Sequence, residues 1–348
     1  MSHFTVLVRF SDAFKNSHGG VQQAINEMLA PYQENNMEDC PKEFLEFNDV
    51  EKEYRKKYKE ESQELVRMPD GKLISKYNDR FKKLKDGSKY SYDRIIPDDC
   101  ELVNVPHNQH YATFEKFMED YGDYEKDEST GKYGYWENPN AKWDWFQIGG
   151  RWQGCLHVKK GARSAKNGEP SLLMKDHKFE DDKVDAAQKC DIDFEGWKAD
   201  TDKQLEEWWK KYQQLLKGTL KEDDNPFYGM HYDLCQMGLR ETPAVNDKEI
   251  EAARKKSPKD RSKWPEAVWM TKEITKAELE INYRWRFEFN TYAACTEKEG
   301  WLEKGKMGWF GCSTDKSEDR EKWGKSFFNR FFLNAPEDEW FAVVDCHI

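Results

Sequence analysis

Apolar residues at both ends of the chain follow patterns that are typical of β-strands. Residues 3–10 read His-Phe-Thr-Val-Leu-Val-Arg-Phe, and residues 340–348 read Trp-Phe-Ala-Val-Val-Asp-Cys-His-Ile. Apolar side chains occupy both parities in each segment, as in a strand that is covered on both faces. Helical spacing predicts helices over residues 21–29 and 202–217 and from about residue 317. Alternation predicts further strands over 143–148 and 286–291.

Strands at the two extremes predict one sheet that contains both terminal strands, with the middle of the chain inserted as arms. We therefore expect an α+β fold with a mixed or antiparallel sheet and helical or irregular insertions. The expected parts are a core domain of residues 1–48 with 100–158 and 274–348, a charged helical insertion over 49–99, and a helical or irregular elaboration over 159–273.

Composition adds that the core is aromatic. Of the 348 residues 37% are hydrophobic, and 14 Trp, 16 Tyr and 20 Phe make up much of that share. High charge with few aliphatic residues is typical of disordered chains. Here the aromatic side chains make up for the few aliphatic ones, because each buried aromatic side chain removes roughly 150–250 Å² from water. The sequence therefore predicts a folded protein.

Charge, hydropathy and cysteine spacing exclude several classes of protein. The 56 Lys and Arg against 67 Asp and Glu give a net charge of −11, which argues against broad nucleic-acid binding but leaves room for a local basic pocket. No run approaches the roughly 18–20 apolar residues of a membrane helix. The eight cysteines are scattered without a C-x-x-C pair. These features, with an N-terminus unlike a signal peptide, predict a cytoplasmic protein with reduced thiols.

Polar residues on the terminal strands are the first candidates for chemistry. Asp345 and His347 lie two apart on one predicted strand and share a face, as do His3 and Thr5 on the other. If the strands are neighbours, His3, Asp345 and His347 converge as a divalent-metal site or as the acid and base of a phosphodiesterase-like hydrolase. The plain alternative is that strand ends are polar because water reaches them. His3-Phe4-Thr5 has the His-x-Thr form of two-histidine phosphoesterases, but the second such motif is absent.

A Gly-Gly-Arg-Trp segment is the second candidate. Gly149 and Gly150 permit close backbone approach, and the side chain of Arg151 can hold phosphate or carboxylate. Aromatic rings for stacking stand at Trp152, Trp143 and Trp145. The combination suits a small nucleotide-type ligand, whereas the alternative is a β-bulge whose arginine stacks on core tryptophans. Lys306 lies in a glycine-spaced loop that either closes over an anion or wraps Trp309 into the core.

Several motifs together resemble a family of uncharacterised proteins encoded by tailed bacteriophages and some bacteria. They are Met-Ser-His-Phe-Thr-Val-Leu-Val at the start, Asn-Pro-Asn-Ala-Lys-Trp-Asp-Trp-Phe-Gln-Ile-Gly-Gly-Arg-Trp at 138–152, and Gly-Lys-Met-Gly-Trp-Phe-Gly with the terminal Val-Val-Asp-Cys-His-Ile. The motifs cover about an eighth of the chain.

The resemblance implies a phage accessory protein in the bacterial cytoplasm, and such genes often encode counter-defence proteins. Together with the residues above, it predicts recognition, and in an enzyme hydrolysis, of a nucleotide-type or phosphate-bearing ligand. Two alternatives stay open. The chain would otherwise be an acidic inhibitor that binds a host protein through the charged insertion over 49–99 and the helix bearing Trp208 and Trp209, or a structural or assembly protein of the virion.

Overall fold

The structure is a computed structural model that describes residues 2–85, 91–171, 180, 182–220, 229–241, 244–257, 270–307 and 313–348. Contacts divide the chain into two compact units. Unit 1 consists of Met1–Tyr32 and Lys142–Ile348, and unit 2 of Gln33–Ala141.

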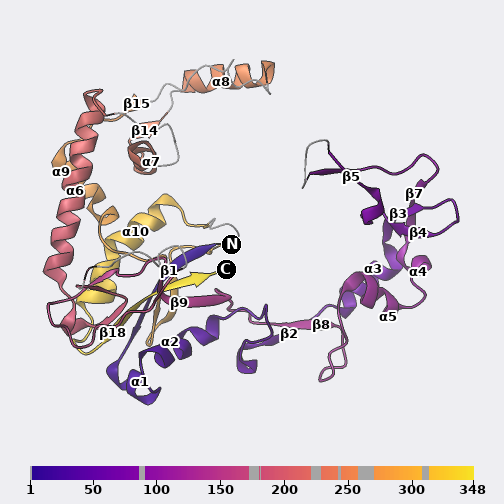
Figure 1. Ribbon diagram of the computed structural model, residues 1–348, viewed down its shortest axis with the longest axis horizontal. Coiled ribbons are helices and arrows are strands. Elements are labelled where there is room, and N and C mark those ends of the chain that lie inside the picture. The colour runs from indigo at the N-terminus through magenta and orange to yellow at the C-terminus, as the bar shows by residue number, and fades with distance from the viewer. Residues whose placement is uncertain are drawn as a thin grey trace. The chain divides into compact units, whose positions relative to one another are not determined.

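Unit 1 is built on a seven-stranded mixed sheet that contains both terminal strands (Figure 1). The strand order is β11-β9-β18-β1-β16-β17, and β13 pairs with β18 outside this path. β1 runs antiparallel to β18 and parallel to β16. The α+β prediction is therefore confirmed. The strands are β1 (His3–Phe10), β9 (Trp145–Gly150), β11 (Glu169–Pro170), β13 (Ala186–Gln188), β16 (Ala293–Thr296), β17 (Gly300–Glu303) and β18 (Trp340–His347).

Helices cover both faces of this sheet, which explains the apolar residues on both parities of β1. The even-numbered side chains from Phe4 to Phe10 pack with helix α2 (Val21–Leu29). On the opposite face Leu7 packs with Phe327 of helix α10 (Ser317–Phe328) and with Trp197 of helix α6 (Phe194–Leu216). Figure 1 shows α2 on one side of the sheet and α10 and α6 on the other.

The rest of unit 1 consists of short helices and two-stranded ribbons. Tyr212 of α6 organises a smaller core, where its hydroxyl donates to the carbonyl of Lys272. The elements are α1 (Asp12–Ser17), α7 (Gly229–Gln236), α8 (Ala244–Lys256), α9 (Lys276–Tyr283), the pair β10 (Leu156–His157) and β12 (Lys183–Val184), the pair β14 (Arg240–Glu241) and β15 (Met270–Thr271), the 3-10 turns η1 (Ala30–Tyr32), η5 (Lys189–Asp191) and η7 (Arg284–Arg286), and the π-turn η9 (Asn329–Leu333).

Unit 2 has its own small aromatic core, formed by Phe114, Phe117, Met118 and Val50. Helix α3 (Glu51–Glu60) is charged, as its sequence predicts. The elements around it are β2 (Glu46–Asp49) with β8 (Gly134–Glu137), β3 (Ser62–Arg67) with β4 (Leu73–Ser75) and β7 (Glu101–Pro106), β5 (Lys82–Leu84) with β6 (Tyr92–Arg94), the helices α4 (His107–His110) and α5 (Phe114–Phe117), the 3-10 turns η2 (Lys42–Phe44) and η3 (Asp79–Phe81), and the π-turn η4 (Met118–Gly122).

The boundaries of the units differ from those expected at residues 49, 99, 159 and 273. Unit 2 is wider than the insertion because β2 pairs with β8 and β7 pairs with β3, so both flanks of the insertion belong to it. The elaboration over 159–273 belongs to unit 1, because β13 adds a strand to the main sheet.

The strand expected over residues 286–291 does not form. Phe287 packs against the core of Trp208, whereas Phe289 stacks on Trp197 in the core beneath the main sheet. The two rings are therefore buried in different clusters while the backbone between them pairs with no strand of the described chain. The adjoining strand is β16, which begins only at Ala293.

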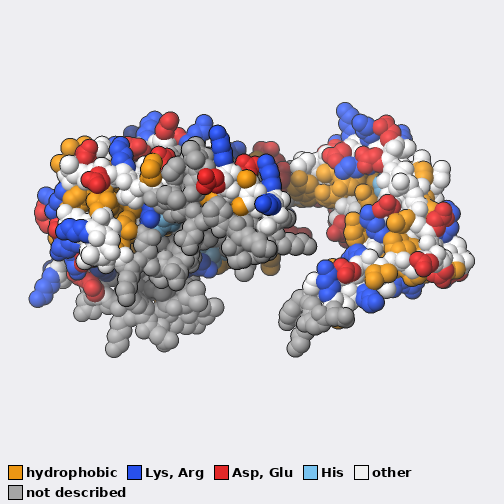
Figure 2. Space-filling model, turned by 90° about the horizontal axis from the view of Figure 1, so that it is seen from above, with side chains coloured by type: hydrophobic (Ala, Val, Ile, Leu, Met, Phe, Trp, Pro, Cys, Tyr) orange, Lys and Arg blue, Asp and Glu red, His pale blue; other side chains and the backbone are white. Residues whose placement is uncertain are grey.

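The surface is mixed in charge. Figure 2 shows Lys and Arg side chains interspersed with Asp and Glu side chains over the described part of each unit. Among the helices of the described chain, none combines the length and the apolar character needed to cross a bilayer.

Truncation of Leu7 tests the contact between β1 and the helical layer. Leu7 is fully buried, so we expect Leu7→Ala to lower the free energy of unfolding by about 2–5 kcal/mol through lost burial and the cavity left behind. Leu333, which is 48% exposed, is the matched control, and its replacement by alanine should cost roughly 1 kcal/mol or less. Denaturant unfolding measures both, and equal losses would contradict the layered packing.

Candidate functional site

The register of β1 and β18 brings His3, Asp345 and His347 together. His3 lies opposite His347, and Thr5 lies opposite Asp345. The two-residue period of a strand then places all three side chains on the face of the sheet that carries Leu7. The imidazole rings of His3 and His347 are 5.0 Å apart between centroids and nearly perpendicular, at 75°. The convergence expected of neighbouring terminal strands is therefore present.

Each imidazole is held by a carboxylate. Nδ1 of His3 donates to Oδ1 of Asp345 over 2.8 Å, and Nδ1 of His347 donates to Oδ1 of Asp144 over 2.6 Å. A carboxylate on Nδ1 fixes the tautomer and the orientation of the ring, and it leaves Nε2 as the atom that can exchange a proton with a ligand. The site thus contains two histidine–carboxylate pairs side by side.

Sequence reasoning missed Asp144. It lies just before β9, in a segment where the pattern shows only alternation. Its role becomes visible only through the pairing of β9 with β18, in which Trp145 lies opposite His347. The amide of Asp144 also donates to the carbonyl of His347 over 3.0 Å, so backbone and side chain both fix this residue against the last strand.

The four side chains are largely withdrawn from water. Their exposed fractions are 10% for His3, 1% for Asp345, 7% for His347 and 23% for Asp144. Nε2 of His347 is buried and has no hydrogen-bond partner among the described residues. Burying an unpartnered polar atom costs about 1–3 kcal/mol. This arrangement does not fit the alternative in which these residues are polar only because water reaches the strand ends.

The Gly-Gly-Arg-Trp segment carries the backbone over Asp345. Gly149 and Gly150 have φ of 74° and 57°, in the left-handed region that favours glycine. The bend brings the amide of Arg151 within 2.9 Å of Oδ2 of Asp345, to which it donates. A Cβ on Gly150 would lie 2.5 Å from Cβ of Asp345. The bend predicted from the glycines is therefore present, and the carboxylate under it explains why side chains are excluded.

A second buried carboxylate lies under the same bend. A Cβ on Gly149 would lie 2.5 Å from Oδ2 of Asp185, which is fully buried. Asp185 accepts hydrogen bonds from the amides of Gly154 and Gly168 over 2.6 and 2.8 Å. Burial raises the pKa of the Asp185 carboxyl, while the two amide donors oppose that rise. No pattern in the sequence singles out Asp185, because it lies between two very short strands.

The side chains expected to bind a ligand have different placements. Trp145 is 42% exposed, stacks on His347 at 5.2 Å and 15°, and meets the edge of His3. The side chain of Arg151 is exposed and forms no hydrogen bond or ion pair within the described chain. Trp152 is half-buried against the core that contains Leu156.

Two of the expected residues do not join this cluster. Trp143 is buried in the core on the other face of the sheet, where its indole nitrogen donates to the carbonyl of Leu29 over 3.0 Å. Lys306 is exposed just beyond β17, and no contact joins it to either imidazole within the described ranges. Gly308, Trp309 and the rest of that loop to 312 lie outside the described residues.

No group of three or more His, Cys, Asp and Glu side chains in the described part of the chain is arranged to hold a metal ion. Asp345 and Asp144 each direct an oxygen to an imidazole nitrogen. The arrangement therefore fits proton transfer better than the metal-site alternative.

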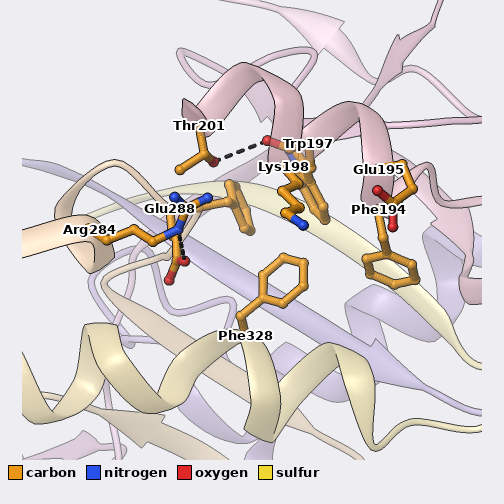
Figure 3. A pocket seen from close by; sticks show the side chains of 9 residues that line it. Phe194, Glu195, Trp197, Lys198, Thr201, Arg284, Glu288 and Phe328 are labelled. Carbon is orange, nitrogen blue, oxygen red and sulfur yellow. Dashed lines mark hydrogen bonds and ion pairs between the residues drawn. The ribbon is translucent and has the colours of Figure 1, made fainter. Parts of the chain in front are cut away.

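A separate cavity of about 310 Å³ lies between α6 and α10 (Figure 3). Trp197 and Phe328 form its aromatic walls, and Lys198 points into it. Arg284 at one side is already paired with Asp202, Glu280 and Glu288. None of the residues lining this cavity belongs to the histidine cluster.

The chain matches no model of a known protein family, no curated protein and no solved structure.

Gly149→Ala tests the bend over the buried carboxylates. Gly161 has a similar φ of 81° with nothing near its missing Cβ, so Gly161→Ala is the matched control for backbone strain alone. We expect the control to cost about 1–2 kcal/mol of unfolding free energy. Gly149→Ala should cost about 1–3 kcal/mol more, because the Asp185 carboxylate must move off its donors. Denaturant unfolding of both variants gives the difference. Equal losses of unfolding free energy would contradict the close approach of Gly149 to the Asp185 carboxylate.

Asp185 should also leave a signature in the pH dependence of stability. Because its pKa is raised in the folded state, its contribution to stability is fully present below the unfolded value of 3.8 and is lost as pH rises through the folded pKa. The unfolding free energy of the wild type should therefore fall relative to Asp185→Asn as pH rises above about 4.

Asp191 is the control of opposite sign. Its hydrogen bond from the Ser164 hydroxyl lowers its pKa, with smaller contributions from backbone donors. The contribution of Asp191 to stability is present above its unfolded pKa of 3.8, and it is lost as pH falls through the folded pKa. The wild type should lose stability relative to Asp191→Asn below about pH 4. Parallel pH profiles for the two variants would refute the assignment.

Proposed function

We propose that this protein binds a phosphate-bearing, nucleotide-type ligand and hydrolyses it with His3 and His347 as the proton-transferring groups. The observation that carries the proposal is the pair of carboxylate-bound imidazoles 5.0 Å apart at one end of the sheet. One histidine–carboxylate pair is common in protein structures for purely structural reasons. Two adjacent pairs supply both an acid and a base, which is what cleavage of a phosphodiester requires.

The proposed chemistry uses the two Nε2 atoms. Because Nε2 of His347 is buried, the Trp145 ring that stacks on His347 must move for a ligand to reach it. Nε2 of one imidazole takes a proton from the attacking water, whose oxygen forms the new bond to phosphorus. The other imidazole, in its protonated form, gives its proton to the oxygen that leaves with the electrons of the broken P–O bond. Asp345 and Asp144 stabilise the imidazolium in each pair. His3 and His347 are the catalytic residues in this proposal, and the two aspartates are positioning residues.

Recognition would use the exposed groups beside the imidazoles. The Trp145 ring is partly exposed while it stacks on His347, so it offers a face on which a nucleobase can stack. The Arg151 amide is fixed on Asp345, and its free guanidinium can reach an oxyanion as a two-pronged donor. Both groups act beside the proton-transferring atoms, which supports a ligand that combines a ring and a phosphate.

One residue expected to contact a partner in the protein-binding alternative, Trp208, is not on the surface. Trp208 is buried against Tyr212 and donates to Asp233 over 3.1 Å, so its ring serves the core of unit 1. Charged helix α3 is exposed, as a solvated face also requires. The phage setting, the counter-defence role and the virion alternative rest on the motif resemblance and stay predictions.

His347→Gln tests the proposal. Incubation with cyclic mononucleotides, dinucleotides and bis(p-nitrophenyl) phosphate, followed by chromatography, should show cleavage of at least one by the wild type. His347→Gln and His3→Gln should each lower the rate by about 100-fold or more, because either the base or the acid is lost. Both variants should keep the thermal stabilisation that the ligand gives, whereas Arg151→Gln should weaken it.

His18→Gln is the matched control, since His18 is a surface histidine that stacks on Phe14. It should cleave at the rate of the wild type. No cleavage and no thermal shift with any member of the panel would overturn the proposal and favour the protein-binding alternative.

A further inference from the structure

A second cavity, of about 430 Å³, lies in unit 1 away from the histidine cluster. It forms where the end of α7, the turn η7 and the first turn of α10 meet. Its lining is more polar than that of the cavity in Figure 3. The residues that matter for its chemistry are Tyr283, Trp285, Arg286, Ser317 and Arg320.

Arg286 enters this cavity without a partner. It is half-buried, yet its guanidinium forms no hydrogen bond or ion pair with any residue that the structure describes. The guanidinium lies over the ring of its neighbour Trp285, at 5.4 Å from the ring centroid. Arg284, two residues earlier, shows the contrast, because it is paired with three carboxylates. A half-buried guanidinium without a hydrogen-bonded counter-ion is costly, and a bound anion would offset that cost.

The acidic groups near Arg286 are occupied elsewhere. Asp315 pairs with Arg320 over 2.7 Å, and Glu321 pairs with Lys325 over 2.5 Å. The negative charge of Asp233 acts on Arg286, but its carboxylate accepts a hydrogen bond from the indole nitrogen of Trp208.

Burial lowers the pKa of Arg286, and the charge of Arg320 acts in the same direction. Arg286 is therefore a cation without an ion-pair partner among the described residues, in a cavity that Arg320 and Glu321 also line, although the chain as a whole carries a net charge of −11.

The wall that presents Arg286 is rigid. The Trp285 indole nitrogen donates to the carbonyl of Asn282 over 3.0 Å. The Trp285 ring lies so close to Gly324 that a Cβ there would clash with it. Arg320 is held on the other side by Asp315 and by the side chain of Gln236 over 3.2 Å. The Arg320 guanidinium and the Trp285 ring beside Arg286 are thus held in place before any ligand arrives, which reduces the entropy lost on binding.

We propose that this cavity is a second binding site, for the phosphate group of a small molecule, with Arg286 as its principal contact. The planar fork of a guanidinium matches the oxygens of a phosphate, and a half-buried position strengthens the contact relative to one in water. The Arg320 guanidinium and the Ser317 hydroxyl line the same cavity and add donors. The volume is sufficient for a mononucleotide-sized ligand. The site is distinct from the histidine cluster and does not depend on the activity proposed for it.

Calorimetric titration of the full chain with pyrophosphate, AMP and adenosine tests the assignment. Pyrophosphate and AMP should bind saturably, and adenosine at least about ten-fold more weakly, because it lacks the phosphate. Arg286→Gln should weaken the binding of pyrophosphate and AMP by about ten-fold or more, and Arg286→Lys by less, since it keeps the charge but loses the fork. Arg330→Gln, at a surface arginine paired with Glu299, is the charge-matched control and should bind as the wild type does.

Arg151→Gln separates this site from the histidine cluster, because it removes the phosphate contact proposed there, and it should leave pyrophosphate binding unchanged. Arg286→Gln should keep or raise the melting temperature, because it removes an uncompensated half-buried charge. The proposal is overturned if the wild type binds neither phosphate probe, if Arg286→Gln binds both as the wild type does, or if Arg151→Gln abolishes the binding. Citrate displacing AMP as strongly as pyrophosphate does would overturn the assignment to phosphate.

Discussion

The antiparallel pairing of β1 with β18 is the contact on which the architecture of unit 1 depends. It joins residues more than 300 positions apart in eight consecutive pairs, from His3 opposite His347 to Phe10 opposite Trp340. This register sets which side chains face each helical layer, and it also sets the histidine cluster. Because side chains alternate along a strand, a slip of one residue would place Asp345 and His347 on the face opposite His3. Packing on both faces therefore specifies the geometry of the candidate site.

Buried carboxylates connect this sheet to its surroundings. Asp345 receives a donor from β1 and another from the bend after β9, while Asp185 receives two from separate loops. Asp345 thus ties the bend to strands that already pair in the sheet, whereas Asp185 ties together the two loops that contain Gly154 and Gly168. The positive φ of Gly149 and Gly150 lets the backbone lie directly on these side chains. The distinctive sequence of this bend has a structural cause, and Arg151 and Trp145 lie at its edge with exposed surfaces.

Much of this arrangement could be predicted from the sequence, and the rest depends on tertiary register. The two-residue period places Asp345 with His347 and His3 with Thr5, and only the adjacency of the terminal strands had to be assumed. Asp144 could not be assigned, because its partner is fixed by the pairing of β9 with β18. The same period wrongly groups Trp143 with Trp145: β9 begins only at Trp145, so Trp143 precedes the strand and turns into the opposite core. Phe287 and Phe289 alternate with polar residues as in a strand, but the reason is that their rings pack against two separate cores.

The position of β1 in the sheet has a consequence for how the chain is made. Its two neighbours, β16 and β18, begin at residues 293 and 340, so residues 11–292 are synthesised before either is present. During that time an apolar strand of eight residues has both edges unpaired, a condition that favours aggregation. Closing so long a loop is also slow, since the entropy is lost before the contacts form. Protection of this first strand during translation is thus a requirement that the finished fold places on the cell.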